Sequence, residues 1–423
     1  MDTQTLIALI IFISTYAFIV SEKIDRTAIS FLGASCLILF GVLNEKEAIH
    51  FIDFNTIGLL IGMMIIVNIL KTTGLFQYIA IKSAKLSKGE PLTIMIVFCF
   101  VTAVLSAFLD NVTTVLLIAP VTLVITDTLN LNPIPFLVPQ IISSNIGGTA
   151  TLVGDPPNIM IGSAANIGFL DFLLNTGPIA FLILIITLFL FNIIYKKQLI
   201  VSDDVKKKIF KFDEKLAITN KSLLIKCLTI LFLVIIGLMT HQIFGLESSS
   251  IALIGASVML IISKANVEET LHSIEWTTIF FFMFLFILVG GLEKVGVIDE
   301  IAKVIVSFSQ DNLPLATILL LWAAAILSSF LDNIPFVATM IPLIKKISLL
   351  SNMNVMPLWW ALSLGACLGG NGSLIGASAN VIVAGILKKN NHEVSFVEYM
   401  KIGFPMMIIS IIFSTIYLLI FYV

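Results

Sequence analysis

An Asp-Asn pair interrupts a long apolar run at Phe108-Leu109-Asp110-Asn111-Val112, and the pattern returns at Phe330-Leu331-Asp332-Asn333-Ile334. Each stretch places a carboxylate and a carboxamide between two apolar arms. A charged side chain at the centre of a bilayer costs roughly 2.5–3.5 kcal/mol on insertion scales, so such a residue marks a functional site by default. We therefore interpret the two Asp-Asn pairs as the tips of two helical hairpins that line a transport site.

The composition indicates a membrane protein. Of the 423 residues 58% are hydrophobic and 12% charged, and the mean hydropathy is +1.09. So few charges cannot cover the surface of a soluble protein of this size. Apolar runs of about 20 residues recur, which is the length that one helical crossing needs. Because these runs are continuous rather than alternating, they predict an all-α polytopic membrane protein.

The second half of the chain repeats the first. Adding 222 to a residue number finds an equivalent residue without a gap across residues 32–161. Chance similarity between apolar sequences does not explain matched polar residues, glycines and prolines, which include His50 and His272, Pro120 and Pro342, Gly147 and Gly369, and Asn158 and Asn380. We predict a first repeat at 1–195, a charged cytoplasmic linker at 196–222 with eight lysines against four acids, and a second repeat at 223–423.

Each repeat is expected to hold three spans, a re-entrant hairpin, a broken helix and a final span. In the first repeat these elements are predicted at 6–20, 27–43, 54–70, 91–128 (with arms of about 16 residues), 135–166 and 172–195. The whole chain then has about ten crossings plus two hairpins. Since five crossings per repeat is an odd number, the two repeats have inverted topology, as in many secondary transporters.

Charge in the loops predicts the orientation. Most lysines lie in the loops 21–26, 71–90, 196–222, 264–275 and 388–401, whereas loops such as 44–53 and 293–313 lean acidic. The positive-inside rule then puts both termini outside the cell, although Lys345-Lys346 goes against the trend. No organelle address is visible, so the cell (plasma) membrane is the expected location.

Four breaks in the helices are expected to meet near the middle of the membrane: the two hairpin tips and two glycine-rich interruptions. Non-helical backbone is tolerated at that depth only where it is buried in protein or lines a cavity. Helix ends there offer free N–H groups to anions and carbonyls to cations. The candidate substrate- or ion-binding residues are Asp110, Asn111, Thr113, Thr149, Thr151, Asp155, Asn158, Asp332, Asn333, Asn371, Ser373 and Asn380.

The chemistry of these residues suggests coupling to an ion. Asp110 and Asp332 supply charge that a proton can neutralise, so H⁺ is the expected coupling ion. Sodium, held by the two Asp-Asn pairs, is the alternative. A structural alternative is that each aspartate caps the helix that follows it. Asp155 has Ala377 as its repeat partner, so the halves are not chemically equivalent. No cofactor, resident metal or catalytic residue is expected.

The run Gly147-Gly148-Thr-Ala-Thr-Leu-Val-Gly-Asp-Pro-Pro-Asn158 after Asp110-Asn111 resembles the ion transporter superfamily. It is most similar to the branch of ArsB-type arsenite permeases, NhaD-type sodium/proton antiporters, the melanosomal P protein and citrate-transporter-like permeases. The resemblance covers essentially the whole chain. It implies a scaffold of outer spans, a transport part of hairpins and broken helices, and alternating access. A second copy of the chain and, if the protein is ArsB-like, an ATPase subunit are candidate partners.

The tips also bear on the substrate. Related divalent-anion symporters carry Ser-Asn-Thr at these places, and carboxylates there would repel a di- or tricarboxylate unless they were protonated. Arg26, the one arginine, is expected in a terminal loop, which leaves no arginine to clamp a carboxylate. We expect proton-coupled efflux of arsenite or antimonite. A sodium/proton antiporter is the alternative, a citrate or dicarboxylate symporter is less favoured, and matched breaks disfavour an uncoupled channel or receptor.

Overall fold

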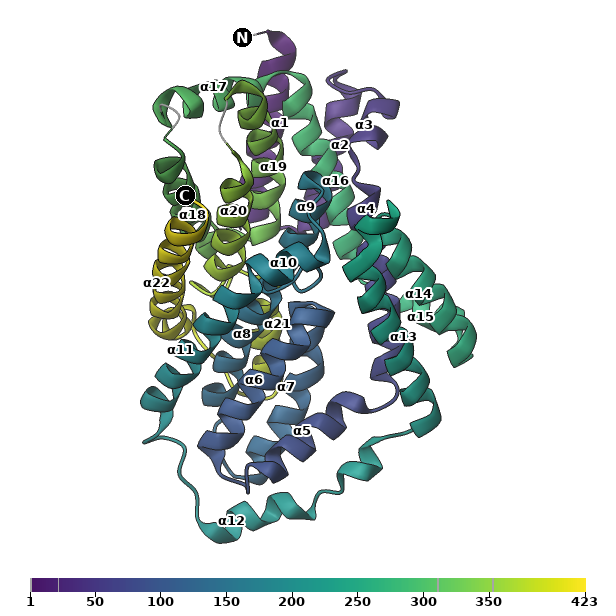
Figure 1. Ribbon diagram of the computed structural model, residues 1–423, viewed down its shortest axis with the longest axis vertical. Helices are drawn as coiled ribbons and strands as arrows, with labels where there is room; N and C mark the ends of the chain where they lie inside the picture. Colours follow the sequence, from purple (N-terminus) through teal and green to yellow (C-terminus); the bar gives the residue numbers. More distant parts are fainter. Residues whose placement is uncertain (1, 22, 310–311, 352–353) are drawn as a thin grey trace.

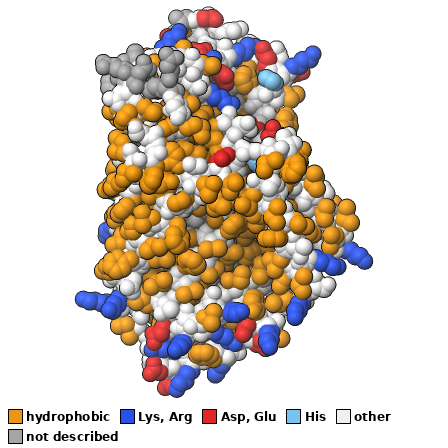
Figure 2. Space-filling view, in the orientation of Figure 1, with side chains coloured by type: hydrophobic (Ala, Val, Ile, Leu, Met, Phe, Trp, Pro, Cys, Tyr) orange, Lys and Arg blue, Asp and Glu red, His pale blue; other side chains and the backbone are white. Residues whose placement is uncertain are grey.

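The computed structural model describes residues 2–21, 23–309, 312–351 and 354–423, and every regular element in them is helical (Figure 1). Of the 293–313 loop, residues 310 and 311 lie outside the described part. Ten described helices are long and apolar enough to cross a membrane: α1, α4, α6, α7, α11, α13, α16, α18, α19 and α22. On the face shown in Figure 2, hydrophobic side chains cover the middle of the molecule and most charged side chains lie toward its two ends. The chain is therefore a multi-pass membrane protein, as predicted.

The first half runs from α1 to α11. Its helices are α1 (Thr3–Ser21), α2 (Arg26–Leu39), α3 (Glu45–Phe51), α4 (Phe54–Lys71), α5 (Leu75–Leu86), α6 (Pro91–Leu109), α7 (Asn111–Thr128), α8 (Ile134–Thr149), α9 (Pro156–Ala165), α10 (Phe169–Asn175) and α11 (Gly177–Tyr195). The hairpin, the broken helix and the final span appear in the predicted order. A further bend of 114° separates α9 from α10, which the sequence did not predict.

The linker and the second half follow. The linker holds α12 (Asp203–Lys207) and two short 3₁₀ turns. The helices after it are α13 (Lys221–Thr240), α14 (Ser248–Ser263), α15 (Val267–His272), α16 (Trp276–Lys294), α17 (Val297–Ser309), α18 (Leu313–Phe330), α19 (Asn333–Leu350), α20 (Met356–Gly369), α21 (Ser378–Lys389) and α22 (Phe396–Phe421).

Helix lengths correct one expectation. The four hairpin arms α6, α7, α18 and α19 contain 19, 18, 18 and 18 residues, so the predicted 16 is too short. Pro120 lies inside α7, as expected, and Pro342 lies inside α19. By contrast, α2 and α14 contain only 14 and 16 residues.

The two halves exchange packing partners. Helix α2 packs against α16 and its repeat counterpart α14 packs against α4. Likewise α7 packs against α21, and α19 packs against α9. Hairpin α6–α7 lies in the lower half of Figure 1 and hairpin α18–α19 in the upper half, as inverted repeats require. The boundaries at residues 195 and 222 stay predictions.

Ion pairs join the loops at each end of the molecule. Lys294 Nζ lies 2.5 Å from Glu47 Oε2, and Lys85 pairs with Glu214 of the linker. The 44–53 and 293–313 loops therefore share one end, and the 71–90 and 196–222 segments share the other. Lys346, one of the two lysines that oppose the charge trend, pairs with Asp299 at 2.9 Å, so its charge is balanced. Which end faces outward stays a prediction.

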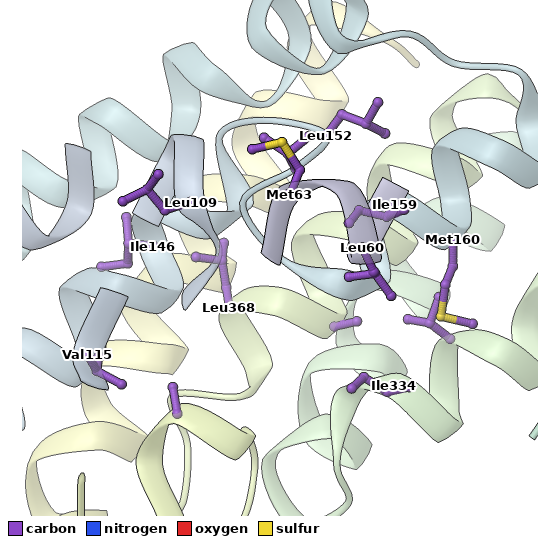
Figure 3. Close-up of a cluster of buried hydrophobic side chains, with 14 of the residues drawn as sticks. Leu60, Met63, Leu109, Val115, Ile146, Leu152, Ile159, Met160, Ile334 and Leu368 are labelled. Carbon is purple, nitrogen blue, oxygen red and sulfur yellow. The ribbon is translucent and has the colours of Figure 1, made fainter. Parts of the chain in front are cut away.

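Close helix crossings set the positions of the breaks. A Cβ on Gly147 of α8 would lie 2.0 Å from the carbonyl oxygen of Ala103 in α6, so only glycine fits there. Gly369 of α20 meets the Ala325 backbone of α18 in the same way. Around the breaks, Leu60 of α4, Ile159 of α9 and Ile334 of α19 belong to one buried apolar cluster (Figure 3). This packing holds each hairpin tip against a broken helix.

Candidate functional site

Both tip aspartates cap the helix that follows. Asp110 Oδ1 accepts a hydrogen bond from the Thr113 backbone N–H at 2.8 Å, and Asp332 Oδ1 accepts one from Ile334 N–H at 3.1 Å. The backbones differ, because Asp110 has φ +88° and ψ 153° whereas Asp332 has φ −54°. The first conformation is one that essentially only glycine adopts without a cost of about 1–3 kcal/mol, and such strain gathers at functional sites. Both aspartates therefore cap the following helix, as the structural alternative predicted, and of the two tips only the one at Asp110 has a strained backbone.

A cavity of about 250 Å³ lies where the elements of the two halves meet. Four predicted residues line it: Asp110, Asn111, Asp155 and Asn333. The first hairpin tip, the first broken helix and the second hairpin tip are therefore brought together. Five further polar residues line the same cavity and were missed: Arg26, Glu275, Thr277, Thr278 and Ser378.

Asp155 reaches across from one half to the other. It precedes α9, is 1% exposed and makes no capping bond to that helix. The Nδ2 atom of Asn333, on the second hairpin, lies 3.4 Å from both of its carboxylate oxygens. Ala377 takes the equivalent backbone conformation before α21 without any charge. Asp155 therefore belongs to the cavity through contacts that its repeat partner cannot make.

Asp332 lies on a neighbouring cavity instead, one of about 330 Å³. Its Oδ2 atom is 2.5 Å from Arg26 Nη1 and accepts a hydrogen bond from Ser378 Oγ at 3.0 Å. Arg26 also donates to Ser378 Oγ at 3.0 Å, and its guanidinium lies 4.9 Å from the ring centroid of Phe281. The two tip aspartates thus sit in different surroundings.

The expected place of Arg26 in a terminal loop is wrong. Asp25 caps α2 with bonds from Thr27 and Ala28 N–H, so Arg26 is the first residue of the helix. The Thr27 hydroxyl donates to the Thr277 carbonyl in the first turn of α16 at 3.0 Å, which holds the start of α2 against the start of α16. Arg26 lines both cavities. The argument that no arginine is available near the site therefore fails.

A buried network of carboxamides joins the halves. Asn145 of α8 accepts a hydrogen bond from Asn111 Nδ2 at 3.2 Å. Its own Nδ2 donates to Asn371 Oδ1 at 2.9 Å and to Asn380 Oδ1 at 3.0 Å. Sequence reasoning missed Asn145, because its repeat partner is Cys367 and the 222-residue offset does not mark it. Two network atoms, Asn111 Oδ1 and Asn371 Nδ2, are buried and have no hydrogen-bond partner among the residues that the structure describes.

The remaining predicted residues form hydrogen bonds at or next to the helix interruptions. Thr149 Oγ1 donates to the Asn145 carbonyl at 2.8 Å, and Asn158 Nδ2 donates to the Thr151 carbonyl at 3.0 Å. Asn380 repeats this bond with the Ser373 carbonyl at 2.9 Å. The hydroxyls of Thr151 and Ser373 bond to carbonyls of the hairpins. Neither these residues nor Thr113 line the central cavity, so they position the site.

Glu275 is the third carboxylate on the cavity. It precedes α16 and accepts a hydrogen bond from Thr278 Oγ1 at 3.2 Å. Its repeat partner is Asp53, which caps α4 through Thr56. A pair of acids at equivalent span starts was therefore a signal that could have identified it. Three carboxyl groups, those of Asp110, Asp155 and Glu275, therefore line the cavity beside one guanidinium, which already pairs with Asp332.

Comparison of the chain with known proteins indicates that it is a transporter. The citrate transporter model, CitMHS, matches residues 16–365 of the chain. The chain belongs to the CitMHS citrate transporter family. This family membership, with ten apolar helices, makes it a secondary transporter of the ion transporter superfamily, as the motifs indicated.

Several proteins are similar to this CitMHS family member. An uncharacterized transporter of Mycobacterium tuberculosis is 40% identical over 423 residues, which covers 98% of each chain. The human P protein is 33% identical over 506 residues, which covers 100% of this chain but only 60% of the P protein. The structure of the Alcanivorax borkumensis YdaH transporter matches 99% of the chain and 97% of its own, with a TM-score of 0.52 and 14% identity. This last likeness shows the fold alone.

Proposed function

We propose that this CitMHS family member exports arsenite or antimonite in exchange for protons. The observation that carries the proposal is the set of three carboxylates, Asp110, Asp155 and Glu275, around the central cavity. The hydroxide form of such a metalloid is neutral and carries several O–H donors. Carboxylate oxygens and the unpartnered Asn111 Oδ1 atom are suitable acceptors for those donors.

Proton exchange fits the same residues. A carboxylate in a cavity between apolar helices is costly to keep charged, and a proton removes that cost. Asp110 has only a helix-capping bond among the contacts of the described residues, so nothing of opposite charge holds it ionised. We therefore assign the coupling proton to Asp110 first, with Asp155 and Glu275 beside it.

A polycarboxylate substrate is less favoured, on grounds of charge. Arg26 is present, but its guanidinium already faces the Asp332 carboxylate. Unless protons neutralised them, three carboxylates would meet a citrate-like anion in a cavity of about 250 Å³. Like charges at such separations repel by several kcal/mol in a medium of low dielectric constant. The family description alone does not outweigh this repulsion.

Sodium/proton antiport is the second candidate. Sodium prefers oxygen ligands, and Asp110, Asn111 and Asp155 supply carboxylate and amide oxygens on the lining of the cavity. The buried Asn111 Oδ1 atom has no hydrogen-bond partner within the described part of the chain, so it can contact a cation. In this function sodium and protons would alternate on the same carboxylates.

The cellular setting belongs to the same proposal. We place the protein in the plasma membrane with both termini outside, on the basis of the loop lysines. A second copy of the chain is a candidate partner. If export of arsenite holds, an ATPase subunit is another.

The test uses the full chain in vesicles that contain a pH-sensitive dye. Arsenite and sodium are added in turn, with Asp110→Asn as the variant that keeps an oxygen acceptor for the Thr113 cap. We expect arsenite to change the internal pH of wild-type vesicles and Asp110→Asn to abolish the change. A response to sodium with none to arsenite would replace the first candidate with the second.

A further inference from the structure

Asp110 and Asp332 occupy equivalent positions in the two repeats, but only Asp332 forms an ion pair with Arg26. Asp332 receives Arg26 Nη1 at 2.5 Å and Ser378 Oγ at 3.0 Å on a single oxygen, while its other oxygen caps α19. Both carboxylate oxygens are therefore used. The matching position to Arg26 in the other half is Ser248, which hydrogen-bonds to Asn55. Asp110 thus has no arginine in the corresponding place.

No other described titratable side chain forms an ion pair with Arg26 in place of Asp332. On the Asp332 side the titratable neighbours are Tyr16, which donates to the Pro335 carbonyl at 2.8 Å, and Asp25, which caps α2. On the other side of Arg26, the central cavity presents Asp110, Asp155 and Glu275. Among the described contacts only Asp332 lies within ion-pair distance of the guanidinium.

The pair also joins two parts of the fold. Arg26 starts α2, which packs on α16, whereas Asp332 and Ser378 start α19 and α21 beside the breaks. The guanidinium is further fixed over the Phe281 ring of α16. Its position therefore does not depend on Asp332 alone, and a charge-paired, hydrogen-bonded geometry of this kind favours the ionised carboxylate.

We propose that Arg26 is a fixed counter-ion that keeps Asp332 charged and tied to α2, so that only Asp110 of the two tip carboxylates exchanges a proton. Arg26 acts through Asp332 and is a positioning residue. The assignment rests on the proton-coupled transport proposed above, and it sharpens that function. Asp332 at the second tip then has a structural role, whereas Asp110 at the first tip exchanges the proton. The two aspartates that the repeat relates therefore have different functions.

Infrared titration of the purified full-length protein tests the assignment without a substrate. Difference spectra across the neutral range report the carboxylic-acid C=O band of each carboxyl group that gains a proton. We expect a band that Asp110→Asn removes and that Asp332→Asn leaves in place. Arg26→Gln should add one further band, and the double variant Arg26→Gln/Asp332→Asn should lack that added band. Arg26→Lys, which keeps the charge, should match wild type.

The outcomes are separable. Loss of a wild-type band in Asp332→Asn, or no added band in Arg26→Gln, overturns the role of Arg26. If Arg26→Gln does not fold, the Asp332→Asn spectrum alone decides, because the inference requires it to keep every wild-type band. A wild-type spectrum as expected, with no proton flux evoked by arsenite or by sodium in vesicles, refutes the proposed function and leaves the ion-pair assignment standing.

Discussion

Asn333 places its carboxamide nitrogen 3.4 Å from both carboxylate oxygens of Asp155, although 178 residues separate them in the chain. The contact joins the second hairpin tip to the first broken helix. Its repeat-related counterpart would pair Asn111 with Ala377, which has no carboxylate. Asn111 bonds to Asn145 instead. The pseudo-symmetric scaffold therefore presents an asymmetric set of charges.

Asp155→Ala should keep the fold and lose transport. Ala377 shows that alanine fits this backbone, since φ and ψ are −146° and 134° at Asp155 and −148° and 144° at Ala377. Removing a cavity carboxylate should lower proton-linked flux at least about tenfold, which corresponds to about 1.4 kcal/mol. Vesicle flux and thermal melting in detergent measure the two effects, with the exposed Asp127→Ala as the control. A transport-competent Asp155→Ala protein would remove Asp155 from the site.

Strain at the first tip predicts an unusual order of stability. At Asp110, glycine should be more stable than alanine by about 1–3 kcal/mol, because φ +88° is open to glycine only. At Asp332, with φ −54°, alanine should be as stable as glycine or more stable by about 0.5–1 kcal/mol. Melting temperatures of the four variants give the comparison. Equal behaviour at the two tips would mean that the first is not strained.

The crossing of α8 over α6 should not tolerate a methyl group. Gly147→Ala would place a Cβ 2.0 Å from the Ala103 carbonyl oxygen, so the helices must separate. We expect a loss of at least about 1–3 kcal/mol, which is typical of overpacking. Gly385→Ala is the matched control, since among the described residues no atom beyond the local helix backbone and the adjacent residues lies within 4 Å of its Cβ position. Thermal unfolding of the two variants should differ clearly, and similar curves would contradict this packing.

Asn145 should contribute to stability through the partners it satisfies. Asn145→Ala leaves Asn111 Nδ2, Asn371 Oδ1 and Asn380 Oδ1 without their present bonds. Unsatisfied buried groups cost about 1–3 kcal/mol each, although such bonds in membrane proteins average nearer 0.6 kcal/mol. A drop of about 1–3 kcal/mol in total is expected, measured by denaturation in detergent. Asn390→Ala at the exposed end of α21 serves as the control, and a drop no larger at Asn145 would argue against the network.

The linker should loosen in acid. The Lys85 ammonium lowers the pKa of Glu214 below its ordinary value of 4.5, so the folded state favours the charged carboxylate. The stabilisation is therefore complete above pH 4.5 and lost as the pH falls through the lowered value. Hydrogen exchange of the linker backbone should rise at that point, modestly because the pair is partly exposed. Glu214→Gln should exchange faster than wild type above pH 4.5 and should match wild type once the wild-type carboxylate is protonated. An unchanged profile would mean that the pair does not hold the linker.

Apolar runs, glycine and proline positions and the 222-residue offset were enough to predict the helical class, the order of elements and the two breaks. These features act locally, because a helix must bury its polar backbone in lipid and cannot continue through a glycine-rich Pro-Pro segment. The same features identified Asp110, Asn111, Asp155 and Asn333, whose polarity stands out within apolar surroundings. Arg26, Asn145 and Glu275 escaped, since each lies at a helix start or within a helix whose partners come from distant segments.

The sequence by itself therefore determined that the chain is a membrane protein, that its two halves are repeats, and that carboxylates interrupt its apolar segments. Only the tertiary structure decided which carboxylate meets which partner. Packing of α2 on α16 carries Arg26 to Asp332, while Asp110 and Asp155 share a cavity without a free cation among the described lining residues. The physical reason is that charge pairing depends on distances across helices, and those distances are set by packing between segments far apart in the chain.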